Sequence, residues 1–328
     1  MLLLVSLSAL QRLSNFSIIT RMTIPAYLNL SEVELKERAN QTFMRMENCD
    51  LCARFCHINR LAGKLGVCKT SLQARVSNYG SHMGEEDPLR GWKGSGTIFF
   101  ARCNLRCVFC QNHDISQTDA GEEVTAQELA NIMLKLQAHG CHNINLVSPS
   151  HVVPQILEAL VLAIEGGLHT SLVYNSGGYD TPETLKLLEG IVDIYMPDMK
   201  YANGGNAKKY SRAQDYPPVN RAAVREMYRQ VGDLQTDDHG IATRGLLVRH
   251  LVLPRNLAGT KQIVQFLADE ISRGTYLNLM AQYHPAYQAG SYPELNRRIT
   301  ANEYNAAVQM AKEAGLTNVD GNFVPEVF

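Results

Sequence analysis

The sequence predicts an α/β protein in which helices cover a parallel sheet. Six short apolar segments have the pattern of buried strands, and segments with apolar residues three or four positions apart lie between them. Two of the helical segments open with a capping box, formed by Thr125 with Glu128 and by Thr300 with Glu303. Such alternation favours right-handed crossovers, with the helices on one outer side of the sheet.

The elements can be placed along the chain from these patterns. A first helix is expected over residues 31–46, where Ser31 can cap and Glu34 follows three residues later. Residues 69–95, which are rich in glycine and turn residues, and the polar residues 203–218 are expected to be loops. The six strands are expected at residues 97–101, 144–147, 172–174, 191–196, 246–253 and 277–280. The later helices are expected at residues 125–140, 154–165, 181–188, 224–231, 263–271 and 300–315.

Composition places the chain among ordinary globular proteins. It has 328 residues, a net charge of -1 and 45% hydrophobic residues, enough for one large domain or one large and one small domain. The near-neutral charge gives no reason to expect nucleic acid or a membrane surface as a partner. Of the eight cysteines, seven fall in two tight groups, which favours metal binding over disulfides and predicts a reducing, cytoplasmic location.

The N-terminus is apolar but does not have the pattern of a signal peptide. The stretch MLLLVSLSAL has no basic residue before its apolar run and no clear cleavage site, and it is too short to span a bilayer. We expect residues 1–24 to be a tail or a mis-assigned start, with Met22 as an alternative first residue.

A group of four cysteines follows the first helix. Cys49, Cys52 and Cys56 are close in sequence, and Cys68 comes after a glycine-containing turn. Four thiols can close a tetrahedral zinc site or hold a complete iron-sulfur cluster, and His57 is an alternative ligand. The residue types do not separate zinc from a second iron-sulfur cluster, and free thiols are a third interpretation.

A group of three cysteines follows the first predicted strand. Cys103, Cys107 and Cys110 stand in GTIFFARCNLRCVFCQN. Because structural zinc and most iron-sulfur clusters take four ligands, three thiols leave one metal position free for a reactant. The same spacing could put three small side chains on one face of a buried helix, but Asn104 and Arg106 make the stretch too polar for that.

This motif resembles the radical S-adenosylmethionine (SAM) superfamily, and CNLRCVFCQN is most similar to activating enzymes of the pyruvate formate-lyase type and their uncharacterised relatives. The resemblance implies a (βα)6 partial TIM barrel. It also implies a [4Fe-4S] cluster on Cys103, Cys107 and Cys110, whose fourth iron binds SAM. Reduction, by a donor such as flavodoxin or ferredoxin, would cleave SAM to a 5′-deoxyadenosyl radical that takes a hydrogen atom from a substrate.

The resemblance also implies SAM-binding residues at the strand ends. The segment YMPDMK resembles DLDLK of the activating enzymes, so Lys200 would pair with the SAM carboxylate and Asp198 would help to position the ligand. The segment YNSGG is similar to DTNG and places Asn175 or Ser176 near SAM.

Further positions follow from the same comparison. Arg249 in VRHLVLP matches the arginine position of the family, His284 in QYHP would lie against the nucleoside, and Phe109 would contact adenine. Where activating enzymes carry Gly-Gly-Glu after the second strand, this chain has Ser148 and its neighbours SPSH, which offer a hydroxyl or carbonyl in place of a carboxylate.

The predicted organisation is a tail and helix (residues 1–45), a small cysteine-rich metal-binding region (46–90) and a radical SAM core with its C-terminal helix (91–328). The predicted function is reductive SAM cleavage followed by hydrogen abstraction from an unidentified substrate, as in the activation of a glycyl-radical protein. Modification of a peptide or small molecule is a second interpretation. A non-catalytic iron-sulfur or zinc redox protein is a third, from another class.

Overall fold

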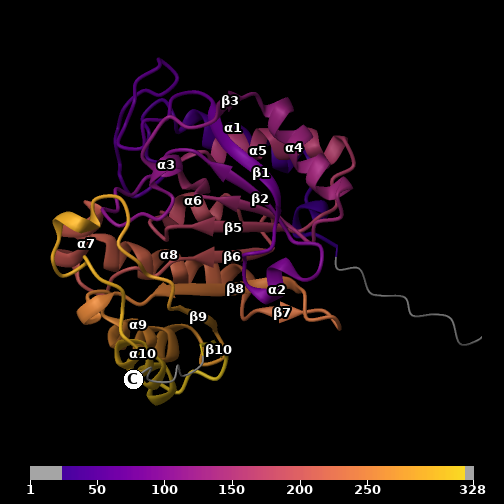
Figure 1. Ribbon diagram of the computed structural model, residues 1–328. Helices are drawn as coiled ribbons and strands as arrows, with labels where there is room; N and C mark the ends of the chain where they lie inside the picture. Colours follow the sequence, from indigo (N-terminus) through magenta and orange to yellow (C-terminus); the bar gives the residue numbers. More distant parts are fainter. Residues whose placement is uncertain (1–23, 322–328) are drawn as a thin grey trace, which may run out of the picture.

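The computed structural model describes residues 24–321, so the predicted N-terminal tail lies outside the described residues. Within them, one sheet holds ten strands in the order β10-β9-β8-β6-β5-β4-β2-β1-β3, and β7 pairs with β8 (Figure 1). Six central strands run parallel and follow the chain order: β2 (Ser95–Phe100), β4 (Ile144–Val147), β5 (Leu172–Ser176), β6 (Ile194–Pro197), β8 (Ala242–Leu251) and β9 (Tyr276–Met280). The marginal strands are β1 (Ala74–His82), β3 (Glu122–Val124), β7 (Gln235–Thr236) and β10 (Val319–Asp320).

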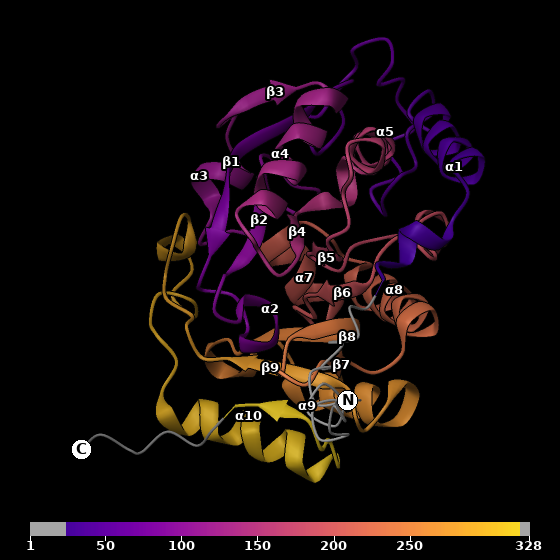
Figure 2. The same ribbon diagram turned by 90° about the vertical axis from the view of Figure 1, so that its right-hand side faces the viewer.

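The register of the parallel strands aligns their carboxyl ends. Thr97 pairs with Asn145, Asn145 with Val173, and Val173 with Ile194. The sheet curves when viewed along its strands (Figure 2), and β3 and β10 stand at its opposite ends. The structure therefore confirms the predicted partial barrel of six strand-helix units, open on one side.

The helices lie mainly on the outer side of the curved sheet, and Figure 2 shows α4, α5 and α8 there, with α2 on the inner side. The longer helices are α1 (Glu32–Met44), α4 (Ala126–Ala138), α5 (Val153–Glu165), α7 (Gly204–Ser211), α8 (Tyr216–Val231), α9 (Thr260–Phe266), which continues as a π-helical turn (Leu267–Ile271), and α10 (Ala301–Glu313). The short helices are α2 (Asp87–Arg90), α3 (His113–Ser116) and α6 (Pro182–Lys186), and 3-10 turns cover Ala26–Asn29, Pro149–His151, Pro254–Asn256 and Ala289–Ser291.

Both predicted capping boxes are present. In α4 the Glu128 amide donates to the Thr125 hydroxyl at 3.2 Å, and the Thr125 amide donates to the Glu128 carboxylate at 2.8 Å. The same reciprocal pair forms at Thr300 and Glu303 in α10. These bonds satisfy amides that the first helical turn leaves without partners, which is why the sequence pattern located both helix starts correctly.

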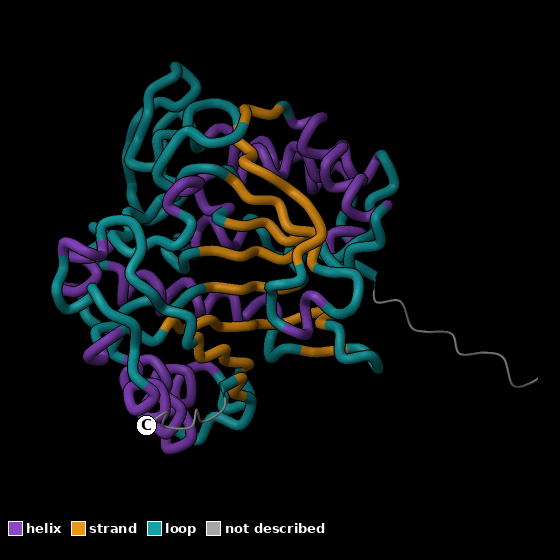
Figure 3. The backbone as a smooth tube through the Cα atoms, viewed as in Figure 1, coloured by secondary structure: helices purple, strands orange, loops and turns teal. Residues whose placement is uncertain are grey.

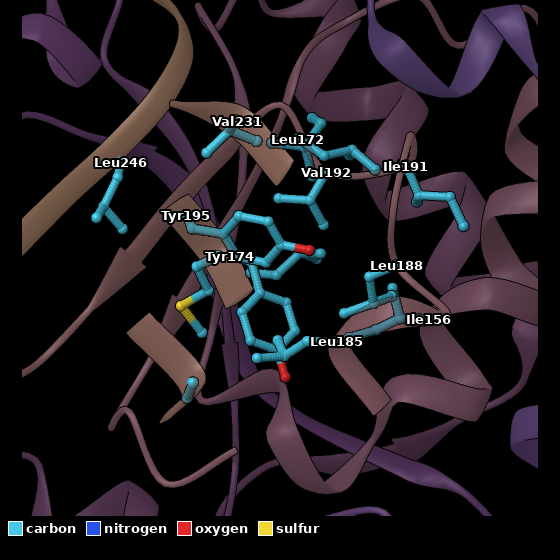
Figure 4. Packing of buried hydrophobic residues seen from close by; sticks show 14 of the residues in the cluster. Ile156, Leu172, Tyr174, Leu185, Leu188, Ile191, Val192, Tyr195, Val231 and Leu246 are labelled. Carbon is cyan, nitrogen blue, oxygen red and sulfur yellow. The ribbon is translucent and has the colours of Figure 1, made fainter. Parts of the chain in front are cut away.

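The main core lies between the sheet and the outer helices. Figure 4 shows Tyr174 of β5 and Tyr195 of β6 packed together above Leu185. Their rings meet edge to face with centroids 5.7 Å apart. Each buried hydroxyl is satisfied, because Tyr174 donates to Asp180 at 2.9 Å and Tyr195 donates to Gln230 at 2.7 Å.

Two predicted loops are wrong. Residues 74–82, within the expected loop 69–95, form β1 and pair antiparallel with β2. A register shift between Val76 and Asn78 interrupts the alternation of apolar and polar residues, which hid this strand from pattern analysis. Within the expected polar loop 203–218, residues Gly204–Ser211 form α7, whose amide at Asn206 is capped by the Asn203 side chain.

The loops that follow the parallel strands gather at one edge of the sheet, on the left in Figure 1, together with α3 and α7. Residues 45–73, which carry the four-cysteine group, lie at the same edge and are almost free of helix and strand (Figure 3). Among the described residues, we find no helix with the length and apolar character needed to cross a membrane.

Candidate functional site

The loop that carries Cys103, Cys107 and Cys110 leaves the carboxyl end of β2 and is fastened on two sides. The Arg102 amide donates to the Ile115 carbonyl of α3 at 3.0 Å. The Val108 amide donates to the Tyr210 carbonyl of α7 at 2.8 Å. The helix that the sequence analysis missed therefore holds the middle of the cysteine loop.

Each of the three thiols has a neighbouring hydrogen-bonding group. The Leu105 amide donates to Cys103 Sγ at 3.4 Å, and the Ser211 hydroxyl donates to Cys107 Sγ at 3.0 Å. Cys110 Sγ and Ser116 Oγ are 3.1 Å apart. Donors around sulfur are the environment that orients metal-bound thiolates and tunes their electronics.

The three thiols line one cavity of about 130 Å³. Burial raises the pKa of Cys107 to about 12, although the nearby Lys200 charge acts in the opposite direction. Burial likewise raises the pKa of Cys103. Thiols in this setting become thiolates when a metal supplies the missing positive charge. Three sulfurs around one cavity, with donors at hand, fit the three cysteine-bound irons of a [4Fe-4S] cluster.

A charged network at the ends of β5, β6 and β8 lines the same cavity. Lys200 Nζ donates to Asp198 at 2.6 Å, and Arg249 Nε donates to the other Asp198 oxygen at 3.0 Å. Arg249 also donates to Asn175 Oδ1 at 2.7 Å. Burial alone would raise the pKa of Asp198, but the charges of Arg249 and Lys200 outweigh it and hold the pKa below its usual value.

Two residues of α8 hold the loops that carry this network, and the sequence analysis assigned neither of them a role. The Tyr216 hydroxyl accepts from the Lys200 amide at 3.0 Å and lies 2.9 Å from the Asp198 carbonyl. Asn220 donates to the carbonyls of Gly178 at 3.0 Å and Asp198 at 2.9 Å. Tyr216 belongs to the Tyr-Pro-Pro sequence of the expected loop, so only the fold reveals its partner.

Gly178 fits this arrangement because it lacks a side chain. Its φ of +69° lies in the left-handed region that favours glycine. A Cβ there would stand 2.2 Å from the Asn220 amide nitrogen and 2.3 Å from the Asp198 carbonyl oxygen. Both contacts are shorter than any that a real Cβ makes.

A larger cavity of about 380 Å³ adjoins the smaller one and shares Cys107, Cys110 and the charged network with it. It extends inside the barrel to Glu85, from the segment after β1. Glu85 stands 4.0 Å from Arg249, and burial raises its pKa. The sequence analysis missed Glu85 because β1 was not predicted.

The structure brings most of the predicted SAM residues to this edge. Asn175, Asp198, Lys200 and Arg249 line both cavities. Phe109 lines the larger one and contacts two tyrosine rings edge to face.

The other two predicted SAM residues lie differently. Ser148 lines the smaller cavity with a left-handed backbone, φ 61°. His284 lines neither cavity; its Nδ1 lies 3.3 Å from Nε2 of Gln111, which lines the larger one. The predicted contact of His284 with the nucleoside would therefore have to be made from the rim.

The four-cysteine group lines a second, separate cavity, which is small, about 10 Å³. Cys49, Cys52, Cys56 and Cys68 all face it, whereas His57 is not among its lining residues and stacks on Phe55 instead. Among residues 24–321, no three His, Cys, Asp or Glu side chains converge closely enough for a single metal ion. Both cysteine groups lie within these residues, and in each group the thiols line a cavity without meeting at one point.

The sequence is similar to a known family and to several known proteins. Residues 97–217 match the family model of the radical SAM superfamily. Uncharacterized protein MJ0674 of Methanocaldococcus jannaschii is 31% identical over 278 residues, which are 82% of this chain and 76% of that protein. Uncharacterized protein MJ0808 of the same organism is 24% identical over 295 residues, 84% of this chain and 82% of that protein.

Two further similarities are more limited. Pyruvate formate-lyase-activating enzyme of Clostridium pasteurianum is 28% identical over 116 residues, 34% of this chain and 48% of that enzyme. The solved structure of TYW1 with a lysine-pyruvate adduct bound superimposes with a TM-score of 0.42 and 10% identity, over 66% of this chain and 73% of the other. The family match and the 31% identity to MJ0674 over most of both chains show that the chain belongs to the radical SAM superfamily, whose membership indicates an enzyme.

Proposed function

We propose that Cys103, Cys107 and Cys110 hold the [4Fe-4S] cluster that the family implies and that the adjoining cavities hold SAM and a substrate. When bound, the cluster and SAM would supply a 5′-deoxyadenosyl radical, formed by reductive cleavage, that abstracts a hydrogen atom from the substrate. The observation that carries the proposal is that the three thiols and the Asp198, Lys200 and Arg249 network share one cavity.

The charges of the network support a ligand with a carboxylate. Lys200 and Arg249 are two partly buried cations, with side chains 20% and 18% exposed, that share the carboxylate of Asp198. An ammonium group has three donors, and one of those on Lys200 is used by Asp198. The remaining donors can bind a carboxylate with charge-assisted hydrogen bonds, which are about twice as strong as neutral ones. Lys200 would thus bind the carboxylate of SAM, and Asp198 would fix its direction.

The other end of SAM would lie toward the larger cavity. Phe109 lines that cavity and packs edge to face with Tyr201 and Tyr283. Ser148, which stands where activating enzymes have a glutamate, would accept from the SAM amino group through its hydroxyl or carbonyl. The absence of a carboxylate at this position makes that hydrogen bond weaker than in activating enzymes.

The proposed substrate is a protein that becomes a glycyl radical or is otherwise activated by hydrogen abstraction. The similarity to a pyruvate formate-lyase-activating enzyme supports this choice. A second candidate is a small molecule or peptide, which is favoured by the volume of the larger cavity, about 380 Å³, since small-molecule sites usually span about 300–1,000 Å³. Glu85 and Gln111 would be the polar groups that meet it.

The proposed electron donor is a flavodoxin or ferredoxin, and the proposed location is the cytoplasm. All eight cysteines are free of disulfides in the structure. Free thiols of this number are typical of proteins in reducing compartments, where low-potential donors are also found.

The experiment that tests the proposal is anaerobic reconstitution with iron and sulfide, followed by reduction with dithionite in the presence of SAM. We expect mass spectrometry to detect 5′-deoxyadenosine with the wild-type protein and not with Cys107→Ala. Cys141→Ala is the matched control, because Cys141 is buried outside both cysteine groups. A wild-type protein that holds a cluster but never forms 5′-deoxyadenosine would leave the non-catalytic redox protein as the better account.

A further inference from the structure

We propose that Cys49, Cys52, Cys56 and Cys68 hold a second iron-sulfur cluster, which passes electrons to the catalytic cysteine loop through Asn104. The first half of this proposal, the cluster itself, stands independently of the proposed function. The second half, the electron relay, rests on it.

The backbone around the four thiols is folded to surround a cavity. The Cys49 amide donates to the Ile58 carbonyl at 2.9 Å, and the His57 amide returns a bond to the Cys49 carbonyl at 3.0 Å. A Cβ on Gly66 would lie 2.8 Å from Cys56 Sγ, so the turn that brings Cys68 back approaches the thiols as closely as glycine allows. Four thiols are a complete ligand set for a [4Fe-4S] cluster.

A buried cation beside this cavity indicates an anionic occupant. The Arg60 side chain is 1% exposed and lines the cavity. Its partners are the Ser71 carbonyl at 2.8 and 3.0 Å, the His151 carbonyl at 2.9 Å and Cys49 Sγ at 3.9 Å. No carboxylate within the described residues forms an ion pair with it. A buried charge without a counter-charge is strongly unfavourable, and a cluster with four thiolates would supply negative charge at this point.

A second buried group beside the cavity, His151, has one ring nitrogen without a hydrogen-bond partner among the described residues. His151 is 2% exposed and is one of the residues that line the cavity. Its Nε2 lies 3.1 Å from the Ala101 carbonyl, which fixes the ring against the start of the catalytic loop, while Nδ1 has no hydrogen-bond partner. Arg60, which has no carboxylate partner in the described chain, and His151, whose Nδ1 is unpaired there, thus line the same cavity as the four thiols.

The four-cysteine region packs directly against the catalytic cysteine loop. Arg54 Nε donates to the Asn104 carbonyl at 2.5 Å. The Asn104 side chain is hydrogen-bonded to the Cys52 thiol, and its Oδ1 lies 3.8 Å from Cys103 Sγ. Cys52 also forms an isolated bridge with Asp180, just after the loop that carries Gly178. The Asn104 side chain thus contacts a thiol of each group.

This placement is what favours an iron-sulfur cluster over zinc. Zinc has no redox chemistry, so it would only order the segment and would gain nothing from a position beside the catalytic loop. A cluster packed against the catalytic loop can accept one electron from a reduced flavodoxin or ferredoxin and give that electron to the catalytic cluster, which returns the second cluster to its oxidised form. No bond is made or broken and no proton moves in this step.

The first test is the metal content of a full-length variant without the catalytic thiols, Cys103→Ala with Cys107→Ala and Cys110→Ala. After anaerobic reconstitution we expect about four irons and four sulfides per chain, and an electron paramagnetic resonance signal on reduction, as for one [4Fe-4S] cluster. Zinc without iron, or no metal at all, would overturn the proposal. This result does not depend on SAM cleavage.

The converse variant is Cys49→Ser with Cys52→Ser, for which we expect the iron content to fall by about half relative to wild type. Cys141→Ala is again the control and should keep all of its iron. Circular dichroism reports whether the converse variant folds. If it does not fold, the metal analysis of the first variant still decides whether the four cysteines hold an iron-sulfur cluster.

The relay is tested by comparing two reductants in the converse variant. We expect the rate of 5′-deoxyadenosine formation with reduced flavodoxin, divided by the rate with dithionite, to fall at least tenfold relative to wild type. An equal loss with both reductants would overturn the relay. Absence of product from the wild-type protein with either reductant would count against the proposed function instead.

Discussion

At the scale of single residues, Lys200 shows how the fold prepares a charge for a ligand. Its ammonium group is buried, which by itself would lower its pKa, but Asp198 and the nearby Cys107 raise the pKa above the usual value. The group is therefore charged at every physiological pH. The backbone amide of Lys200 donates to the Tyr216 hydroxyl, which fixes the position of the residue at the cavity.

We predict that Lys200→Met weakens SAM binding without removing iron. Loss of a hydrogen bond to a charged group is worth about 1.5–3 kcal/mol, which corresponds to a rise of roughly 10- to 150-fold in Kd. Calorimetry on the reconstituted protein measures the affinity for SAM. The variant should fold, because Asp198 keeps Arg249 as a partner. Lys208→Met, an exposed position on α7, is the control. Equal affinities of the two variants would remove Lys200 from the ligand site.

At the scale of elements, α10 depends on one carboxylate at its N-terminus. Glu303 accepts from the Thr300 amide at 2.9 Å, from Arg297 at 2.6 Å and from the Arg255 amide at 2.7 Å. The hydrogen bonds from Arg297, followed by those from the two amides, hold the pKa of Glu303 at about 2. One side chain thus joins α10 to the turn after β8.

We predict that Glu303→Gln lowers the free energy of unfolding by about 1–2 kcal/mol at pH 7, as expected for the loss of a helix cap and its charge. The folded pKa lies below the unfolded value of about 4.3, so the carboxylate stabilises the protein above that pH, and its contribution is lost as the pH falls toward 2. Urea unfolding at pH 7, 4 and 3 should show the difference between wild type and variant shrinking. Glu313→Gln, exposed at the other end of α10, should change little. A difference that stays constant with pH would show that the charge is not responsible.

At the scale of the whole molecule, the cysteine-rich segment and the barrel form one packed unit in the structure. β1 extends the sheet beyond β2, with His82 opposite Ser95. Arg54 and Arg60 donate to carbonyls of the barrel at Asn104 and His151. These contacts join residues that are far apart in sequence, so the N-terminal segment contributes to the stability of the barrel.

We predict that a fragment of residues 91–328 does not reach the native state alone. Removal of β1 would expose the edge of β2 and leave His151 and the cysteine loop without their cover, and open strand edges favour aggregation. Size-exclusion chromatography and near-ultraviolet circular dichroism compare the fragment with the full chain. A monomeric fragment with the Tm of the full chain would instead support the predicted division at residue 90 as an independent domain boundary.

The sequence predicted the parallel strands and most of their helices because their signals are local. Buried parallel strands are continuous apolar runs, and capping boxes such as Thr125 with Glu128 stand three residues apart. β1 escaped prediction because its polar residues and bulge break the pattern. The roles of Tyr216 and Asn220 were not predicted, because the carbonyls that they contact are brought to them only by the tertiary fold.

The site residues likewise divide into those with a local sequence signal and those placed only by the tertiary fold. The spacing of Cys103, Cys107 and Cys110 is enough to predict a metal site. Lys200 lies in a segment that resembles a SAM-binding segment of the activating enzymes. Glu85 carries no such signal, because its place at the cavity depends on the path of a segment that had no predicted structure.

The crowding around Gly178 has a consequence for how the sequence can vary. With an amide nitrogen and a carbonyl oxygen within 2.3 Å of any added Cβ, even alanine requires the loop after β5 or the helix α8 to shift. Such a shift would move the Asp198 carbonyl, and with it the wall of the cavity. A collection of random substitutions at this position should therefore retain glycine alone among active clones, which makes Gly178 a more reliable marker of this arrangement than the charged residues that it supports.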